Sequence, residues 1–553
     1  MTGHSRPQAW ILVVAAIAMV SMTAAACASS EPTSSGGSSN VTSASVRDEG
    51  PSTDGGSATI GVAADTTGWN PHDSQWPYWS VFVGSSVLEP LATIDEDLNA
   101  VPWLAAAWTP NETFDSYKIT VRDDVSFQNG ERFDAAALKL NIDDATTAVL
   151  SGTALKRLVK AVTVTDPTTV QVDLTQPWAT FPSTFMISQG ALMMAPAMLS
   201  SPDRGAHHPI GTGPYTFASW STDSSFRTTR NTTYWQAGKP HLDELNFVPI
   251  GDPSSLASSL QAGDIDMLLT QSYQVATTLE RSGFTVLKNW QSQAGMAMTN
   301  TAPDVGGRPN PVSNIHARKA LAYATDQRAL ADNLGPGVEL PKSPIPSASK
   351  WGLPDDQTGY PDHDLGTAQH EVDLYEEETG APSLSIELSL PTDPDSLAVA
   401  QMLQAQWKQA GIDTTLETKL GAAFSADVVV GNYEVALFNI YNAPDPDSYN
   451  LFWSSANVHP YGEVSINFTR LTTPQMEEDL AIGRGNPDFE ARKLAYDDLV
   501  NQINDNAVNI WTIYSTSSIV ADQDVHGLQQ ASEAPFSSVP ITWLGDLWVS
   551  SSR

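Results

Sequence analysis

The chain has 553 residues and carries 63 acidic against 28 basic side chains, which gives a formal net charge of −35. Nucleic acid and anionic lipid surfaces repel a polyanion of this kind, so we expect neither as a partner. Cys27 is the single cysteine, so an intramolecular disulfide is excluded and stability must come from core packing. The length corresponds to two or three domains.

Residues 1–26 follow the pattern of an export signal. Arg6 lies in a short polar start, and the almost wholly apolar run Ala9–Ala26 ends in small residues. The run is close to the minimum length of a membrane-spanning helix, so an uncleaved anchor is the alternative. Cys27 follows at once, and the stretch resembles a bacterial lipobox, although Ala24 stands where leucine is usual. We expect cleavage before Cys27 and lipidation of its thiol.

Residues 27–57 combine this cysteine with a segment rich in Ser, Thr and Gly that has almost no large apolar side chain. Such a segment cannot bury enough apolar surface to offset the entropy lost on ordering. We therefore expect a disordered tether that holds a folded body at the outer face of a membrane.

The first part of the body alternates short strands with turns. A strand is expected at Ala58–Val62, followed by a tryptophan-rich loop, Asp65–Trp79. Alternating Tyr117, Ile119 and Val121 indicate a half-buried strand. The remaining predictions are a turn at Asn129-Gly130, a helix capped by Asp134, and a hairpin around Asp166-Pro167-Thr168-Thr169.

Two later stretches alternate strands with helices. Asp252 and Pro253 begin a helix that Gly263 ends, and a strand follows at Ile265–Leu269. Leu384–Leu390 reads as a strand, a helix follows, and Ile412–Leu416 reads as a second strand parallel to the first. The body is therefore expected to be α/β, with a hairpin-rich insertion near residues 93–204.

The sequence shows no pattern typical of catalysis. It has no nucleophile elbow, zinc-protease motif, Gly-rich phosphate loop or CxxC pair. His207-His208 and Asp362-His363-Asp364 are more simply read as solvated loops than as metal ligands. A pair of carboxylates distant in sequence stays open as a hydrolase alternative. We expect no enzyme, no metal and no cofactor.

Several segments, taken in order, resemble the oligopeptide/dipeptide class of ABC-transporter solute-binding proteins (family 5). They carry its Glu-Pro-Leu, Phe-x-Asn-Gly, Gly-Thr-Gly-Pro-Tyr, Gly-Asp-Ile-Asp and Asp-Pro-Asp features, and they extend over nearly the whole body. The segments are Val87–Thr109, Tyr117–Ile142, His208–Trp220, Leu260–Leu268, Val312–Leu330, Leu384–Leu416 and Asp445–Trp453.

The resemblance implies a two-lobed, type II periplasmic-binding-protein clamshell with an extra inserted domain. Lobe I would comprise residues 58–92, 205–285 and 516–553, with the insertion, residues 93–204, packed on it, and lobe II would comprise residues 286–515. A small solute or short peptide would bind between the lobes of a monomer. The closed form would dock on the membrane permease of an ABC importer that is driven by cytoplasmic ATPases.

The resemblance also indicates candidate ligand-binding residues. Trp76, Tyr78 and Trp79 lie on the loop after Trp69-Asn70-Pro71-His72, where such proteins place cleft residues, although core packing is the alternative for these aromatics. Gln293 stands before an expected strand at Gly295–Thr299. Tyr441, Asn442 and Asp445 belong to the segment NIYNAPDPD.

Asn442 stands where peptide binders of the family keep the aspartate that receives the ligand's α-ammonium, and Asn439 stands where they keep a tryptophan. An amide cannot supply the charge that a buried ammonium needs. Unblocked peptides are therefore in doubt unless Asp445 substitutes, and a blocked peptide, a sugar, a chelate or another neutral solute is the alternative. An exported hydrolase remains the competing functional class.

Overall fold

The computed structural model describes residues 50–74, 76–95, 97–148, 152–334, 338–528 and 543–550. The expected signal, Cys27 and most of the tether lie outside the described residues. Within those ranges no helix combines the length and the apolar character needed to cross a membrane.

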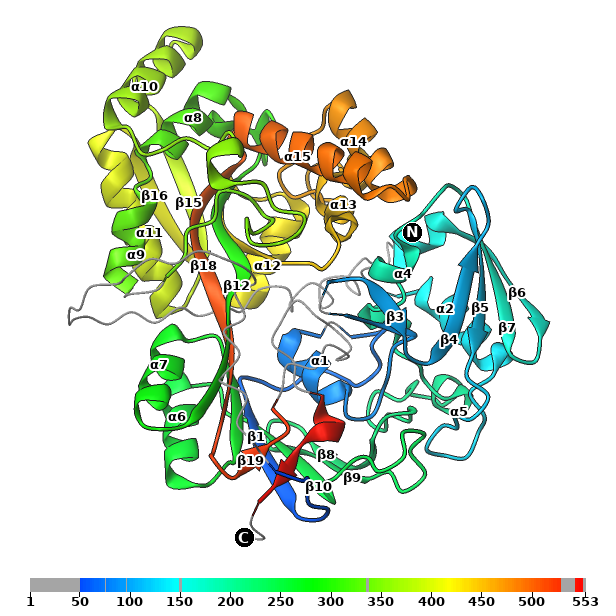
Figure 1. Cartoon of the computed structure of the whole chain (residues 1–553). Coiled ribbons are helices and arrows are strands. Elements are labelled where there is room, and N and C mark those ends of the chain that lie inside the picture. Colours follow the sequence, from blue (N-terminus) through cyan, green and yellow to red (C-terminus); the bar gives the residue numbers. More distant parts are fainter. Residues whose placement is uncertain are drawn as a thin grey trace, which may run out of the picture.

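A ten-stranded mixed sheet runs through the molecule (Figure 1). β12 and β18 lie at its centre, and the other strands extend to either side. In spatial order the strands are β16 (Asp413–Lys419), β15 (Ser385–Pro391), β17 (Val435–Tyr441), β12 (Thr285–Thr299), β18 (Asn509–Ala521), β11 (Met267–Thr270), β1 (Ser57–Val62), β10 (Glu244–Pro249), β9 (Ser225–Arg230) and β8 (Tyr215–Ser221).

A separate antiparallel sheet in the order β4-β5-β7-β6 forms the inserted domain, at the right of Figure 1. Its strands are β4 (Ala105–Pro110), β5 (Ser116–Val121), β7 (Thr169–Leu174) and β6 (Val159–Asp166), and the helix α2 (Ala135–Ala145) packs against them. The helices that matter for the site are α1 (Tyr78–Gly84), α4 (Phe181–Thr184), α11 (Pro394–Gln409), α13 (Asn450–Trp453), α14 (Pro474–Gly485) and α15 (Phe489–Asp505).

Most of the local predictions are confirmed. The Asp134 side chain accepts the Ala137 N–H at the start of α2, and Asp252 caps α6 (Pro253–Ala262), which ends at Gly263 with a left-handed φ of 77°. The β6–β7 hairpin forms as expected, and β15 and β16 pair in parallel on either side of α11.

Three boundaries differ from the predictions. Tyr78 and Trp79 were expected in a loop but begin helix α1, because Pro77 precedes them and fixes a backbone suited to a helix start. The strand expected at Ile265–Leu269 is displaced to β11 (Met267–Thr270). The strand expected at Gly295–Thr299 is only the end of β12, because the largely polar stretch at residues 288–293 in the middle of this strand gives no sign of a buried strand.

The buried side chains form two large hydrophobic cores that share no residue. We call the part of the chain around the first core lobe I, and the part around the second core lobe II. β12 and β18 contribute to both: Leu287 and Ile519 belong to the first core, whereas Met296 and Trp511 belong to the second. These two strands therefore join two bodies that are otherwise packed separately.

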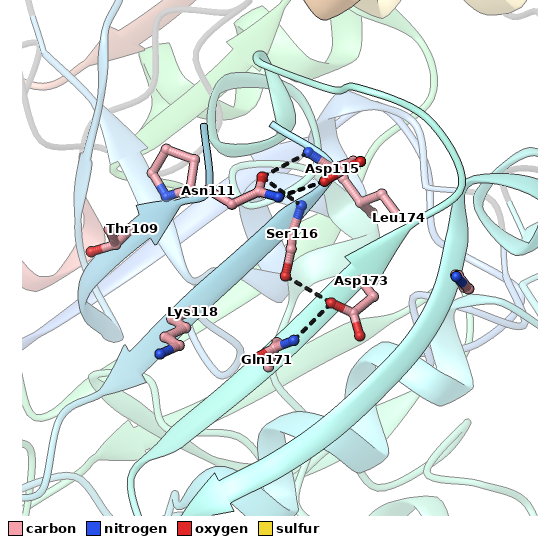
Figure 2. A pocket seen from close by; sticks show the side chains of 10 residues that line it. Thr109, Asn111, Asp115, Ser116, Lys118, Gln171, Asp173 and Leu174 are labelled. Carbon is pink, nitrogen blue, oxygen red and sulfur yellow. Dashed lines mark hydrogen bonds between the residues drawn. The ribbon is translucent and has the colours of Figure 1, made fainter. Parts of the chain in front are cut away.

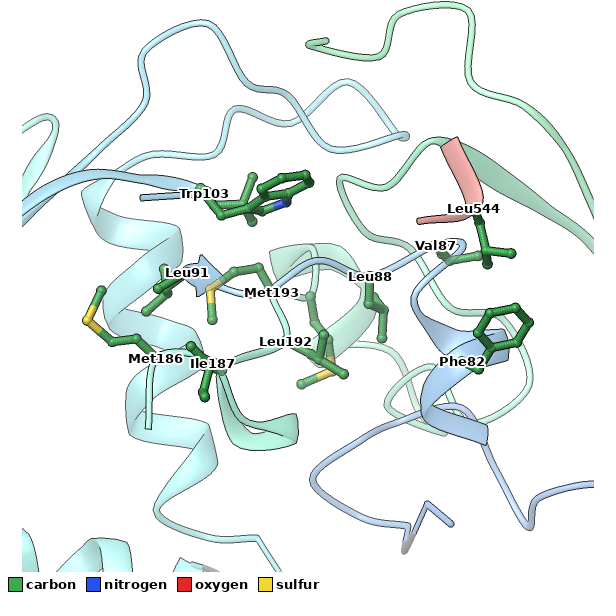
Figure 3. Close-up of a cluster of buried hydrophobic side chains, with 14 of the residues drawn as sticks. Phe82, Val87, Leu88, Leu91, Trp103, Met186, Ile187, Leu192, Met193 and Leu544 are labelled. Carbon is green, nitrogen blue, oxygen red and sulfur yellow. The ribbon is translucent and has the colours of Figure 1, made fainter. Parts of the chain in front are cut away.

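The inserted domain shares the first core with lobe I. Figure 3 shows Leu88 and Leu91 of one part packed with Met186, Ile187 and Met193 of the other. Fully burying each such side chain contributes about 1.5–3 kcal/mol. Lobe I and the inserted domain are therefore packed on one continuous hydrophobic core.

Candidate functional site

The pairing of β12 with β18 is interrupted where the chain passes between the lobes. Asn289 pairs with Ser517 and Gln293 with Ser515, so β12 has two more residues than β18 in this interval. Extra residues of this kind disrupt the ladder and bend the strand locally. The interruption lies where the two strands pass from the first core to the second, and Gln293 lies directly beside it.

Gln293 is a buried polar side chain that makes no hydrogen bond of regular geometry to a described residue. It is 0% exposed, and the only polar group recorded as interacting with its amide, among the residues that the structure describes, is the Tyr441 hydroxyl. In the sheet it lies opposite Tyr441 of β17 on one side and Ser515 of β18 on the other. A buried amide left unpaired costs about 1–3 kcal/mol, so its retention calls for a functional explanation.

Tyr441 and Tyr78 come from different lobes and lie within electrostatic range of one another. Burial raises the pKa of Tyr78, and the interaction with Tyr441 adds to the rise. Burial also raises the pKa of Tyr441 to about 12, and the nearby Gln293 amide partly offsets this. Tyr441 nevertheless remains 38% exposed, so it is enclosed by protein groups while solvent still reaches it.

The aromatic residues of the Asp65–Trp79 segment have two different environments. Trp76 packs edge-on against Trp69 in the first core, and its indole N–H donates to the Gly68 carbonyl at 3.0 Å, which gives it a packing role. Trp79 lies edge-on against Tyr78, with ring centroids 5.1 Å apart, and its buried indole Nε1 has no acceptor. Trp79 therefore offers a free hydrogen-bond donor beside the tyrosine pair.

Asn442 directly follows Tyr441 and is half-buried. Its Oδ1 is inaccessible to solvent and has no donor in the structure. Asn439, two residues before Tyr441 on the same face of β17, lies opposite Gly295, and a Cβ on this glycine would come within 2.9 Å of the Asn439 Oδ1. Glycine at position 295 thus leaves room for an amide at position 439.

Asp445 is engaged by other protein groups. Its carboxylate accepts from Arg492 Nη2 at 2.5 Å and from Ser183 Oγ at 2.9 Å, and it also caps the short turn that begins at Pro446. Burial raises the pKa of Asp445, whereas Arg492 opposes the rise. A carboxylate held in this way has little capacity left for a ligand's ammonium group.

The side chains gathered at the junction are therefore uncharged hydrogen-bonding groups and aromatic rings. Five side chains, from β12, from β17 and the residue after it, and from α1, make up this set: Gln293, Tyr441, Asn442, Tyr78 and Trp79. Through the part of the chain that the structure describes, no three His, Cys, Asp or Glu side chains are grouped as metal ligands would be. Such a set can hold a polar solute by hydrogen bonds and stacking.

A concave region lies on the sheet of the inserted domain (Figure 2). This hollow, of about 680 Å³, is lined by β5, β7 and their flanks. Its polar groups already bond one another: Asn111 donates to Asp115, and Ser116 and Gln171 both donate to Asp173. All of its lining residues come from one domain, so a solute there would not contact both lobes.

Residues that the sequence did not single out surround the Asp-Pro-Asp motif. Trp178, Thr180 and Ser183 of the inserted domain and Arg484 and Arg492 of lobe II all bind its two carboxylates. Trp178, Thr180 and Ser183 lie more than 260 positions before the aspartates. No local pattern could reveal these contacts.

Comparison with known proteins agrees with this architecture. The nickel-binding periplasmic protein of Escherichia coli K12 is 25% identical over 504 residues, which cover 86% of this chain and 94% of that protein. The glutathione-binding protein GsiB of Salmonella paratyphi A is 30% identical over 294 residues, 52% of this chain and 55% of that protein. The structure of AgaA of A. tumefaciens R10 in complex with agropinic acid superposes with a TM-score of 0.77 at 18% identity, covering 90% of this chain and 99% of that one.

The type II periplasmic-binding-protein fold is thereby confirmed. Residues 99–460 match the model of the bacterial extracellular solute-binding proteins, family 5 (middle region). This match covers more than half of the chain, from the inserted domain into lobe II. The chain belongs to the bacterial extracellular solute-binding proteins of family 5.

Proposed function

We propose that this protein is the extracytoplasmic receptor of an ABC importer, which binds a peptide-like or other uncharged polar solute between its lobes and delivers it to a membrane permease. The observation that carries the proposal is the buried Gln293 amide beside the strand interruption, which has no regular hydrogen bond to a described residue and lies near Tyr441, itself within electrostatic range of Tyr78 from the other lobe. A solute that contacts both lobes favours the closed form by its differential affinity for that form.

The chemistry of the junction favours an uncharged solute. An amide such as Gln293 offers one acceptor and two N–H donors, which match the N–H and C=O of a peptide group. Asn442 supplies an acceptor without a charge, and Asp445 is paired with Arg492. A buried ammonium would therefore lack a counter-charge, a loss of several kcal/mol. Blocked or cyclic peptides, sugars and neutral chelates fit better than free-amine peptides.

The relatives bind chemically different ligands, nickel and glutathione among them. Family membership thus supports the receptor role, whereas the class of solute has to be inferred from the side chains at the junction. We propose ligand contacts from Tyr78, Trp79, Gln293, Tyr441 and Asn442. The lobe boundaries at residues 58–92, 205–285, 286–515 and 516–553 stay a prediction.

We propose further that Cys27 carries the lipid and that the tether holds a monomeric receptor at the outer face of the cell membrane. A single acyl chain anchors weakly, at roughly 0.8 kcal/mol per buried methylene, so stable retention needs more than one chain. The partners would be the permease subunits with their cytoplasmic ATPases.

Mass spectrometry of the natively expressed protein tests the proposal. A solute released on denaturation should, when returned to the stripped protein, reduce the radius of gyration measured by small-angle scattering. It should also be recovered unchanged after prolonged incubation. Conversion of the solute to a product would instead show an exported enzyme, and binding without compaction would rule out recognition between two moving lobes.

A further inference from the structure

The Asp-Pro-Asp motif of lobe II contacts the inserted domain across the side of the molecule away from β12 and β18. Asp447 accepts from Trp178 Nε1 at 2.8 Å and from Thr180 Oγ1 at 2.6 Å, and Asp445 accepts from Ser183 Oγ at 2.9 Å. Figure 1 shows α13 to α15 of lobe II facing α4 and its surroundings at this place. Because the inserted domain shares its core with lobe I, these bonds join lobe II to the unit that contains lobe I.

The charges of this cluster are balanced inside lobe II. Arg484 Nε pairs with Asp447 at 2.9 Å, and Arg492 Nη2 pairs with Asp445 at 2.5 Å. Both arginines lie on or beside α14 and α15, as do the main-chain groups that hold them, such as the Gly483 carbonyl that accepts from Arg492. Each carboxylate would therefore keep its counter-charge if the lobes moved apart.

The inserted domain contributes only neutral donors to the same bonds. These are an indole N–H and two hydroxyls. Beside them the Ala179 N–H, also a neutral donor, bonds to the Arg484 carbonyl at 2.8 Å. Water can replace a neutral donor on a paired carboxylate, whereas it cannot cheaply replace a lost counter-ion in a buried site. Hydrogen bonds between charge-paired carboxylates of lobe II and neutral donors of the inserted domain can therefore hold the lobes together and still break reversibly.

We infer that Asp445, Asp447, Trp178, Thr180 and Ser183 form an interlobe latch that stabilises the closed receptor and so sets solute affinity without touching the solute. The inference rests on the proposed closure of the lobes. The latch residues are positioning residues, because they act through the lobes rather than on the ligand.

The test compares the distance between the lobes in the solute-free wild type with that in a solute-free variant. The double variant Thr180→Val/Ser183→Ala removes both hydroxyl donors and leaves every charge paired. Spin labels on cysteines placed at Lys139 of α2 and Leu494 of α15, both exposed, report the separation by pulsed electron resonance. The loss of each hydroxyl bond to a carboxylate is expected to lower the ratio of closed to open molecules by roughly tenfold.

Ser116→Ala is the matched control, because Ser116 Oγ also donates to a carboxylate, that of Asp173, but within the inserted domain. We expect the closed population of the wild type to persist in this control and in Thr180→Ser, which keeps the hydroxyl, and to fall in the double variant. A distance distribution in the double variant equal to that of the wild type would overturn the latch, as would a wild type with no closed population. Cooperative unfolding of each variant confirms that it is folded.

The outcome is separable from that of the proposed function. If the distances respond as expected but no solute is found, the latch stands and the receptor proposal fails. If a solute compacts the protein equally in wild type and double variant, with unchanged affinity, the receptor proposal stands and the latch is refuted.

Discussion

Replacing Glu89 with glutamine should remove a pH dependence from the stability of lobe I. Glu89 is fully buried at the junction of lobe I with the inserted domain. It accepts from Trp103 Nε1 at 2.9 Å, from the Tyr234 hydroxyl at 2.6 Å and from Trp235 Nε1 at 3.2 Å. This is the glutamate of the Glu-Pro-Leu segment, and it joins elements up to 146 positions apart.

The magnitude follows from the pKa of the carboxyl. Burial raises the pKa of Glu89 from 4.5 to about 7, although the hydrogen bonds from Tyr234, Trp103 and Trp235 oppose the rise. Between these two values the folded protein retains a proton that the unfolded chain releases, so the free energy of unfolding falls as the pH rises. At 1.36 kcal/mol for each pH unit, the loss amounts to about 3 kcal/mol.

Urea denaturation at pH values from 4.5 to 8, followed by tryptophan fluorescence, measures this loss. In Glu89→Gln the amide oxygen still accepts from Trp103 and Tyr234, whereas its nitrogen faces the Trp235 N–H. The variant should therefore be less stable at low pH by about 1 kcal/mol, with a flatter pH profile. Other buried acids, such as Asp479 with a pKa of about 6, are the same in both proteins and cancel.

Asp395→Asn serves as the control. Burial, and secondly repulsion by Asp393, raises the pKa of Asp395 to about 7, but this residue lies in the first turn of α11 in lobe II. Because the lobes have separate cores, its substitution should flatten only the lobe II transition. Parallel pH profiles of wild type and Glu89→Gln would refute the reasoning.

Three further outcomes are expected. Cys27→Ala should release the protein from membranes into the medium, as judged by fractionation and immunoblotting, and unchanged retention would show that Ala9–Ala26 is itself the anchor. Gln293→Leu should lower the affinity for the co-purified solute by roughly tenfold or more in calorimetry and should raise the melting temperature, because a buried unpaired amide is removed; a lower melting temperature would mean that the amide has an internal partner. Asn442→Asp should strengthen the binding of unblocked di- and tripeptides by roughly tenfold, by a margin that shrinks with salt. Tight wild-type binding of a free peptide, lost on acetylation of its amine, would show that another acid receives the ammonium group.

Local features were readable from the sequence because each depends on neighbours a few positions away. The cap at Asp134 needs only the N–H of Ala137, and the helix stop at Gly263 needs only a residue that tolerates positive φ. The parallel pair β15 and β16 followed from two apolar strands separated by a helix. Asn442 was predicted as a ligand-binding residue through the family resemblance, from its position in the sequence three residues before Asp445.

The site itself was decided by the tertiary structure. From the sequence, Asp445 was a carboxylate that could receive a ligand's ammonium group. Only the fold brings Ser183 and Arg492 to this carboxylate. The unpaired amide of Gln293 likewise depends on which side chains β17 and β18 place beside it. Charge pairing and burial act through space between residues hundreds of positions apart, whereas periodicity, caps and turns act along the chain. The sequence therefore determined the class of protein, and packing decided which of its polar groups remain free for a solute.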